Sequence, residues 1–169
     1  MKKVIRYLIA DYLNTAGSGT ETAAYSLMGT GFNTLDENPT AKVDKTAYIN
    51  DRSASGSITG YENVFPFDTQ LIADDGAIKF IYDIARNQKT GSDAETDYVR
   101  VELFETAAEG AYPARKFRVA VEVTGVSGAG TEIVKVAGNL HQVGNFQEGT
   151  FNPATKTFTA TQPAAQSNS

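Results

Sequence analysis

Cysteine and tryptophan are absent from the sequence, and His141 is the only histidine among the 169 residues. Without cysteine the chain can form no disulfide framework, thiolate nucleophile or cysteine-based zinc site. A catalytic or metal-ligating histidine needs partners that the fold brings to it, so we interpret this lone histidine as a surface or packing residue. The HExxH, GxSxG and P-loop motifs are also absent. We therefore expect a protein that is not an enzyme and that uses no cofactor or metal.

Long apolar runs and an excess of basic residues are missing as well. No segment approaches the length of a membrane helix, so we expect no membrane partner. The chain has 20 acidic and 15 basic residues, which give a formal net charge of -5 at pH 7. Tight nucleic-acid binding relies on Lys and Arg to neutralise phosphates, so an acidic chain is a poor candidate for it. The same charge would suit a surface that lets DNA pass without holding it.

Two short segments could suggest ligand sites. Residues 93–97 carry acidic side chains at alternate positions, a spacing that could hold Ca²⁺, but they lack the central glycine and the terminal glutamate of an EF-hand loop. We favour the alternative, a solvated turn after a helix. Residues 125–130 are rich in glycine, but their order does not fit a dinucleotide-binding fingerprint and they join two expected strands. This second segment is interpreted as a hairpin turn.

Alternation of apolar and polar residues with a period of two dominates the chain and predicts β-strands. The clearest alternation covers residues 99–104 and 117–124. With the turn at 125–130, the second of these predicts a β-hairpin over residues 117–143. Another strand is predicted over residues 57–65. One amphipathic helix is predicted over residues 74–86, where apolar side chains recur at i, i+3, i+4 and i+7.

These elements predict a mainly β protein, an antiparallel β sandwich or barrel with one packed α-helix. Residues 1–160 are expected to form a single domain, in which residues 1–22 are an N-terminal arm and loop. Residues 161–169 are small and polar, and we expect them to be a disordered tail. Residues 32–56 are interpreted as a long polar connection, within which residues 42–49 alternate apolar and polar and are a candidate edge strand. Loops of that length in a compact domain usually have a function.

Six short segments between about Ala24 and Thr159 resemble, in their order along the chain, the landmarks of one protein family. This family is the siphophage-type tail tube (major tail) proteins of phages and of tail-like particles of Gram-positive bacteria. The segments are Tyr25-Ser26-Leu27-Met28-Gly29, Asn38-Pro39 followed by Tyr48-Ile49, Gly60-Tyr61 through Phe65-Pro66-Phe67, Phe80-Ile81-Tyr82-Asp83, Ala111-Tyr112-Pro113-Ala114, and Gly149-Thr150-Phe151 to Thr157-Phe158-Thr159. The first twenty or so residues have no counterpart, which leaves the role of the N-terminal arm open.

The resemblance implies a β-sandwich tube fold of the tail-tube type and a structural virion protein. Its copies would assemble into stacked, hexameric rings that form the conduit for delivery of double-stranded DNA, which passes without specific binding. The implied partners are the chain itself, a tape-measure protein, and tail terminator or distal tail proteins. The implied location is the tail of a virion made in the cytoplasm of a host bacterium. The alternative is an accessory tail or surface-binding β module that recognises a glycan or a protein.

Two sets of residues are candidates for the function of a tube subunit. Glu102 and Glu122 are the candidate lumen-facing residues, because acidic side chains on strands would repel phosphates. Arg100 and Arg118 occupy the same strand faces, and a solvated outer surface is equally consistent with these charges. The candidate inter-subunit loop comprises Phe32, Asp36, Asn38, Asn50 and Arg52.

Overall fold

The computed structural model describes residues 1–18 and 22–161. Its elements are η1 (Arg6–Leu8), β1 (Ile9–Asn14), β2 (Tyr25–Leu27), β3 (Phe32–Leu35), β4 (Asn38–Thr46), β5 (Ser55–Gln70), α1 (Gly76–Arg86), η2 (Gly91–Ala94), β6 (Glu95–Glu102), β7 (Tyr112–Ser127), β8 (Lys135–Gln142), β9 (Gln147–Asn152) and β10 (Thr157–Ala160). The expected disordered tail lies outside the described residues except for Thr161, whose N–H donates to the carbonyl of Glu148. Nothing in the structure therefore tests the rest of the tail.

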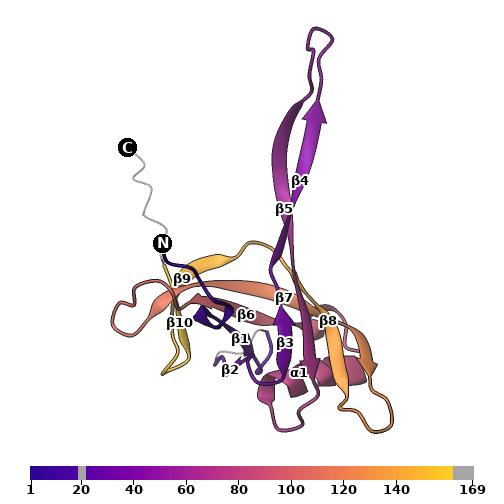
Figure 1. Ribbon diagram of the computed structural model, residues 1–169, viewed down its shortest axis with the longest axis vertical. Coiled ribbons are helices and arrows are strands. Elements are labelled where there is room, and N and C mark those ends of the chain that lie inside the picture. Colours follow the sequence, from indigo (N-terminus) through magenta and orange to yellow (C-terminus); the bar gives the residue numbers. More distant parts are fainter. Residues whose placement is uncertain (19–21, 162–169) are drawn as a thin grey trace.

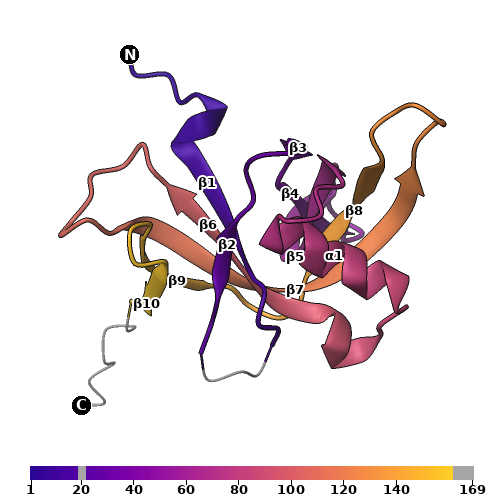
Figure 2. The same ribbon diagram turned by 90° about the horizontal axis from the view of Figure 1, so that it is seen from below.

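The strands form one strongly curved antiparallel sheet in the order β2-β1-β6-β7-β8-β5-β3. The 16-residue strand β7 is central to the sheet. It pairs with β6 along one edge; along the other edge its first residues pair with β9 and its last residues with β8. Figure 2 shows α1 lying across one part of this sheet and the β9–β10 pair at its other end. The predicted class, an antiparallel β sandwich with one packed helix, is confirmed, and so is the hairpin that β7 and β8 form.

The helix follows the apolar stripe that predicted it. The buried residues of the helix are Ala77, Ile78, Ile81 and Ile84. Asp75 caps the first turn, because its side chain accepts a hydrogen bond from the N–H of Ile78 at 3.0 Å. The helix therefore begins two residues later than expected, at Gly76. It packs against the sheet, where its apolar side chains form a larger core with strands from both halves of the chain.

Strand β6 is buried on both faces, which makes the molecule a two-layered structure. Tyr98 lies in the larger core, where Phe65 contacts it edge-to-face with ring centroids 4.8 Å apart. Val99 and Val101 face the opposite way, into a smaller core that contains Phe151 of β9. Because successive side chains of a strand point to opposite faces, one strand can serve both cores.

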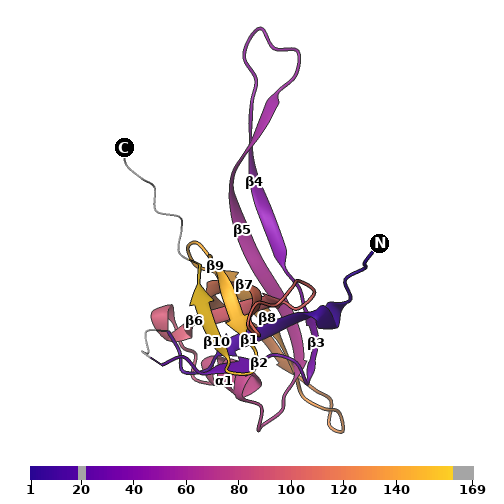
Figure 3. The same cartoon turned by 90° about the vertical axis from the view of Figure 1, so that its left-hand side faces the viewer.

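Residues 32–56, expected to be a long polar loop, are instead mostly strand. β3 pairs with the inner half of β5, and all nine residues of β4 pair with its outer half. The outer half of β5 and β4 together form a two-stranded ribbon that projects from the sandwich (Figures 1 and 3). The strand predicted over residues 57–65 is found within β5, and the edge strand expected over residues 42–49 overlaps β4. The rest of the segment was interpreted as a loop because both faces of the ribbon are exposed, so burial imposes no regular apolar pattern on it.

The expected N-terminal arm, residues 1–22, is also corrected over part of its length. Ile9–Asn14 form β1, an internal strand with β2 on one side and β6 on the other. Its last four residues, from Asp11 to Asn14, are all buried. The three-residue strand β2 covers the outer edge of β1, and such a short strand gives little signal in a sequence.

Phe65 is expected to be a principal support of the larger core. It is fully buried, and Phe117 also contacts its ring at 4.9 Å between centroids. We expect Phe65→Ala to lower the free energy of unfolding by about 3–5 kcal/mol, because it leaves a cavity. Tyr61→Ala, on the same face of β5 but exposed, should change it by no more than about 0.5 kcal/mol. Urea unfolding of the unassembled protein measures both, and equal losses would contradict this account of the core.

Candidate functional site

The projecting ribbon is the most exposed element of the molecule. Its strands pair from Asn38 opposite Val64 to Thr46 opposite Ser55, with one β-bulge next to Lys42. Its large exposed apolar side chains are Val43, Tyr48, Ile49, Ile58 and Tyr61. A two-stranded ribbon without a third strand or a packed helix is marginally stable in water. Exposed apolar side chains gathered on such an element are typical of an interaction surface.

The tip of the ribbon, residues 47–54, is a closed turn. The N–H of Asp51 donates to the carbonyl of Tyr48 at 2.9 Å, and the N–H of Tyr48 donates to Oδ2 of Asp51 at 3.2 Å. These two bonds present Ile49, which is fully exposed, at the end of the ribbon. The candidate inter-subunit residues Asn50 and Arg52 lie in this turn and are exposed.

The other three candidate inter-subunit residues lie away from the tip, in β3, in the β3–β4 connection and at the start of β4. Phe32 is in β3 and packs edge-to-face on Phe67, with ring centroids 6.4 Å apart. The N–H of Asp36 donates to the carbonyl of Pro66, and Asn38 is the first residue of β4. The structure therefore does not bring the five candidates together.

A polar network that the sequence did not reveal holds the root of the ribbon. Its centre is Glu37, in the short connection between β3 and β4. Arg115 of β7 binds this carboxylate with both guanidinium arms, Nη1 to Oε1 at 2.9 Å and Nη2 to Oε2 at 2.8 Å. Nε of Arg100, on β6, lies 3.7 Å from Oε2 of the same group. A bidentate pair of this kind fixes orientation as well as adding energy.

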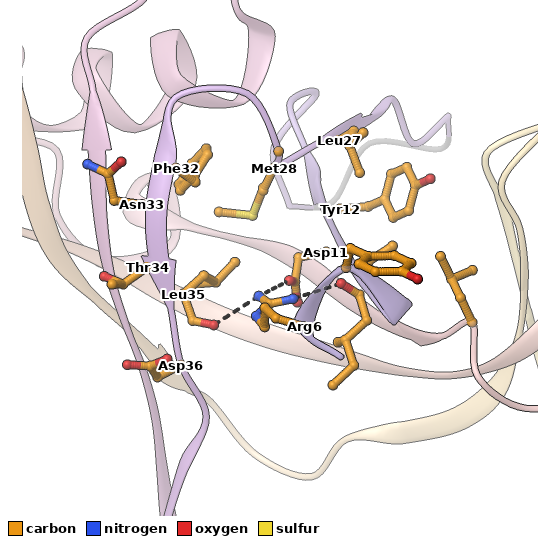
Figure 4. Close-up of a pocket in the computed structure, with 15 residues that line it drawn as sticks. Arg6, Asp11, Tyr12, Leu27, Met28, Phe32, Asn33, Thr34, Leu35 and Asp36 are labelled. Carbon is orange, nitrogen blue, oxygen red and sulfur yellow. Dashed lines mark hydrogen bonds and ion pairs between the residues drawn. The ribbon is translucent and has the colours of Figure 1, made fainter. Parts of the chain in front are cut away.

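The network continues to the N-terminal segment through Asp11, which is buried. Tyr98 donates its hydroxyl hydrogen to Oδ1 of Asp11, and Nη1 of Arg100 lies 3.7 Å from the same oxygen. Arg6 crosses the open side of the sheet and donates from Nη2 to Oδ2 of Asp11 at 2.6 Å and to the carbonyl of Leu35 at 3.0 Å (Figure 4). Side chains from β1, β6, β7 and the β3–β4 connection are thus linked under the ribbon.

Burial and charge act together on the titrating groups of this network. Burial by itself would raise the pKa of Glu37, but the hydrogen bonds and charge of Arg115, with the charge of Arg100, lower the pKa below its ordinary value. Burial, and then the charge of Asp11, raises the pKa of the Tyr98 hydroxyl well above its usual range. At neutral pH the carboxylate of Glu37 is therefore ionised and the phenol of Tyr98 stays protonated and able to donate.

The two candidate lumen residues lie on opposite faces of the sheet. Glu102 follows Tyr98 and Arg100 at intervals of two, so it shares their face. Glu122 lies on the other face, where its carboxylate accepts from Nδ2 of Asn139 at 2.9 Å and lies 3.1 Å from Nε2 of His141. The hydrogen bonds from these two side chains lower the pKa of Glu122.

No metal or membrane site is evident in the described part of the chain. Within residues 1–18 and 22–161, no three His, Asp or Glu side chains come close enough to hold a metal ion. Asp93, Glu95 and Asp97 are not grouped in this way, and Glu95 pairs with Arg118 at 2.7 Å. None of the described helices is long and apolar enough to span a membrane.

The arrangement of strands has a counterpart among solved structures. The chain is similar to one in the cryo-EM structure of the anti-feeding prophage (AFP) baseplate, 6-fold symmetrised, with a TM-score of 0.54 and 6% sequence identity. The match covers 88% of this chain and 96% of that chain. The likeness establishes the fold. No protein-family model and no curated protein sequence matches the chain.

Glu37→Gln tests the anchoring of the ribbon. The substitution removes the charge that Arg115 and Arg100 share, and at pH 7 we expect it to lower the free energy of unfolding by roughly 1.5–3 kcal/mol. Because the folded pKa of Glu37 is lowered, its contribution is present above the ordinary carboxyl pKa and is lost as the pH falls through the folded value.

The measurement is urea unfolding of both proteins from pH 7 down into the acid range. The difference between wild type and Glu37→Gln should shrink as the pH falls. Glu62→Gln is the control: this residue forms an exposed pair with Lys42 at 2.5 Å, and its loss should cost no more than about 1 kcal/mol. A difference for Glu37→Gln that does not depend on pH would show that its carboxylate does not act through its charge.

Proposed function

We propose that the chain is a structural subunit of a phage-like tail particle, which acts by assembling with copies of itself and with other particle proteins and not by catalysis. The observation that carries the proposal is the exposed ribbon of β4 and β5. It extends far from any core of its own chain, and its tip and edges carry apolar side chains. The ribbon has a clear role only if another molecule covers it.

Two features of the ribbon suit contact between copies. Its strand edges are open: β4 pairs only with β5, and the outer half of β5 pairs only with β4 among the described residues. Open edges of this kind template pairing with another chain. Its base is rigid because of the bidentate pair between Glu37 and Arg115, so it can present its tip in a defined direction. The fold likeness to a chain of a prophage baseplate agrees with this proposal.

The finer proposal is a tail tube: stacked, hexameric rings that surround a channel for double-stranded DNA, within the tail of a virion. The six-fold symmetrised structure that contains the similar chain supports a ring as the form of assembly. Tape-measure and tail terminator or distal tail proteins would then be neighbours inside and at the ends of the tube. The segments that resemble tail tube proteins support the same proposal.

The face of the sheet that carries Glu122 is our candidate for the channel wall. Glu95, Asp97 and Glu122 lie on this face, against two formal positive charges, Lys116 and Arg118, on the strands β6 and β7. A wall with net negative charge repels phosphates and releases no counterions, so DNA would slide along it. Glu102 lies on the opposite face, so we do not include it in the proposed channel wall.

Removal of the ribbon tests the proposal of self-assembly. We expect the wild-type protein to form rings or tubes in negative-stain electron micrographs and large species in sedimentation velocity. Replacement of residues 43–58 by Asn-Gly should leave a folded monomer, because the core residues of β5 begin beyond this segment. Val126→Ser, an exposed apolar residue near the β7–β8 turn, is the control and should assemble normally. Assembly of the truncated protein, or a wild type that stays monomeric, would contradict the proposal.

Glu122→Lys tests the channel wall. Tubes should still form, but tubes assembled with short duplex DNA should retain DNA that nuclease cannot digest, and high salt should release it. Wild-type tubes should retain none. The control is Asp83→Lys on α1, which lies on the opposite side of the sheet. Nuclease-sensitive DNA on the Glu122→Lys tubes would place this face on the outside, and equal retention by both variants would remove its special role.

A further inference from the structure

A cavity of about 400 Å³ lies at the root of the ribbon, beside the Glu37 network. Pro39 and Tyr61 of the ribbon, Asn63, and Phe146 of the β8–β9 connection contribute to its lining. The rings of Tyr61 and Phe146 are both exposed, so the cavity has apolar walls open to solvent. At this position β5 leaves the sandwich, and the side chains on one of its faces become exposed: Phe65 is fully buried, Asn63 is 9% exposed and Tyr61 is 64% exposed.

The buried amide of Asn63 has one polar atom without a partner. Its Nδ2 donates to Oε1 of Glu37 at 3.4 Å, whereas its Oδ1 has no hydrogen-bond partner among the described residues. A buried acceptor that is left unpaired destabilises the structure, because it has lost its hydrogen bonds to water without replacement. The neighbouring donors are engaged elsewhere: Arg115 binds Glu37, and Nε2 of Gln142 donates to the carbonyl of Gly144 at 2.8 Å. Among the described residues, no side chain that lines the cavity therefore donates to Oδ1 of Asn63.

The tip of the same ribbon has the complementary chemistry. Its turn is closed by the two bonds between Tyr48 and Asp51, so it is ordered before it meets a partner. It presents the apolar side chains of Tyr48 and Ile49, next to the amide donor of Asn50. An apolar tip with an adjacent N–H donor matches a cavity that has apolar rings on one side and, among its lining residues, an asparagine with an unpaired oxygen.

We infer that the cavity at the root of the ribbon receives the ribbon tip of a second copy of this chain. Ile49 then lies against Tyr61 and Phe146, and an N–H of the turn donates to Oδ1 of Asn63. The inference rests on the proposed self-assembly, and it specifies the contact through which two copies would bind. Tip and cavity are different surfaces: contacts made in one direction around several copies give head-to-tail rings or stacks, whereas reciprocal contacts between two copies give a two-fold pair.

The length of the ribbon sets the spacing of the copies. With tip in cavity, the roots of two neighbouring ribbons are separated by one ribbon length. Nine residues of β4 at about 3.4 Å per residue give roughly 30 Å before the turn is added. An assembly in which equivalent ribbon roots are never separated by about this distance would not contain the contact.

The absence of native cysteine allows a direct test. One protein carries Ile49→Cys at the tip and a second carries Asn145→Cys at the rim of the cavity; both sites are exposed. The two proteins are mixed under assembly conditions and treated with a short bis-maleimide. In the matched control, the second protein carries Ala154→Cys, in the exposed β9–β10 turn, instead of Asn145→Cys. We expect the yield of cross-linked product between the tip and the cavity rim to be at least tenfold higher than between the tip and the control site.

The outcomes separate this inference from the proposed function. Strong joining to the rim, reduced by a further Asn63→Leu change in the rim protein, supports the contact and the role of the unpaired oxygen. Normal tubes or rings with equal joining at both sites, or with joining at the control site alone, overturn the inference and leave self-assembly standing. A mixture that stays monomeric under every condition overturns both.

Discussion

The carboxylate of Glu37 is the point on which the shape of the molecule depends. It lies where the chain leaves the sandwich to form the ribbon, and the two cations that hold it, Arg100 and Arg115, come from neighbouring strands of the sheet. The guanidinium of Arg115 also lies over the rings of Phe117 and Phe146, at 5.1 Å and 5.6 Å from their centroids. Ion pairing and ring stacking therefore fix the direction in which the ribbon leaves the core.

The same network explains why a ribbon can extend without a core of its own. Its strands are held by cross-strand hydrogen bonds, but only the inner half of β5 is anchored by buried rings such as Phe65 and Phe67. Between the buried half and the exposed half, Asn63 and Glu37 provide polar contacts in place of apolar packing. The molecule therefore divides into a body stabilised by its own packing and an extension whose apolar side chains are exposed.

The success of sequence reasoning depended on how each segment is buried. The helix and the β7–β8 hairpin were predicted because one face of each packs on a core, which imposes a period of 3.6 or 2 on apolar residues. The full extent of the ribbon was not predicted, although part of β5 was, because neither of its faces is buried by its own chain. β1 was taken for an arm because its buried residues include Asp11 and Asn14, whose partners lie on distant strands and in the loop.

Composition and local periodicity alone determined the class of the protein: mainly β, with one helix and without the residues for cysteine or histidine chemistry. Tertiary structure alone decided which charges act together. Glu37 and Arg115 are 78 residues apart in sequence, and nothing in the sequence near either residue indicates the pair. It also decided that Glu102 and Glu122 face opposite ways and that Asn63 keeps an unpaired oxygen beside a cavity. A side chain's hydrogen-bond partners depend on strand register and curvature, and these are set by the packing of the whole sheet rather than by neighbouring residues.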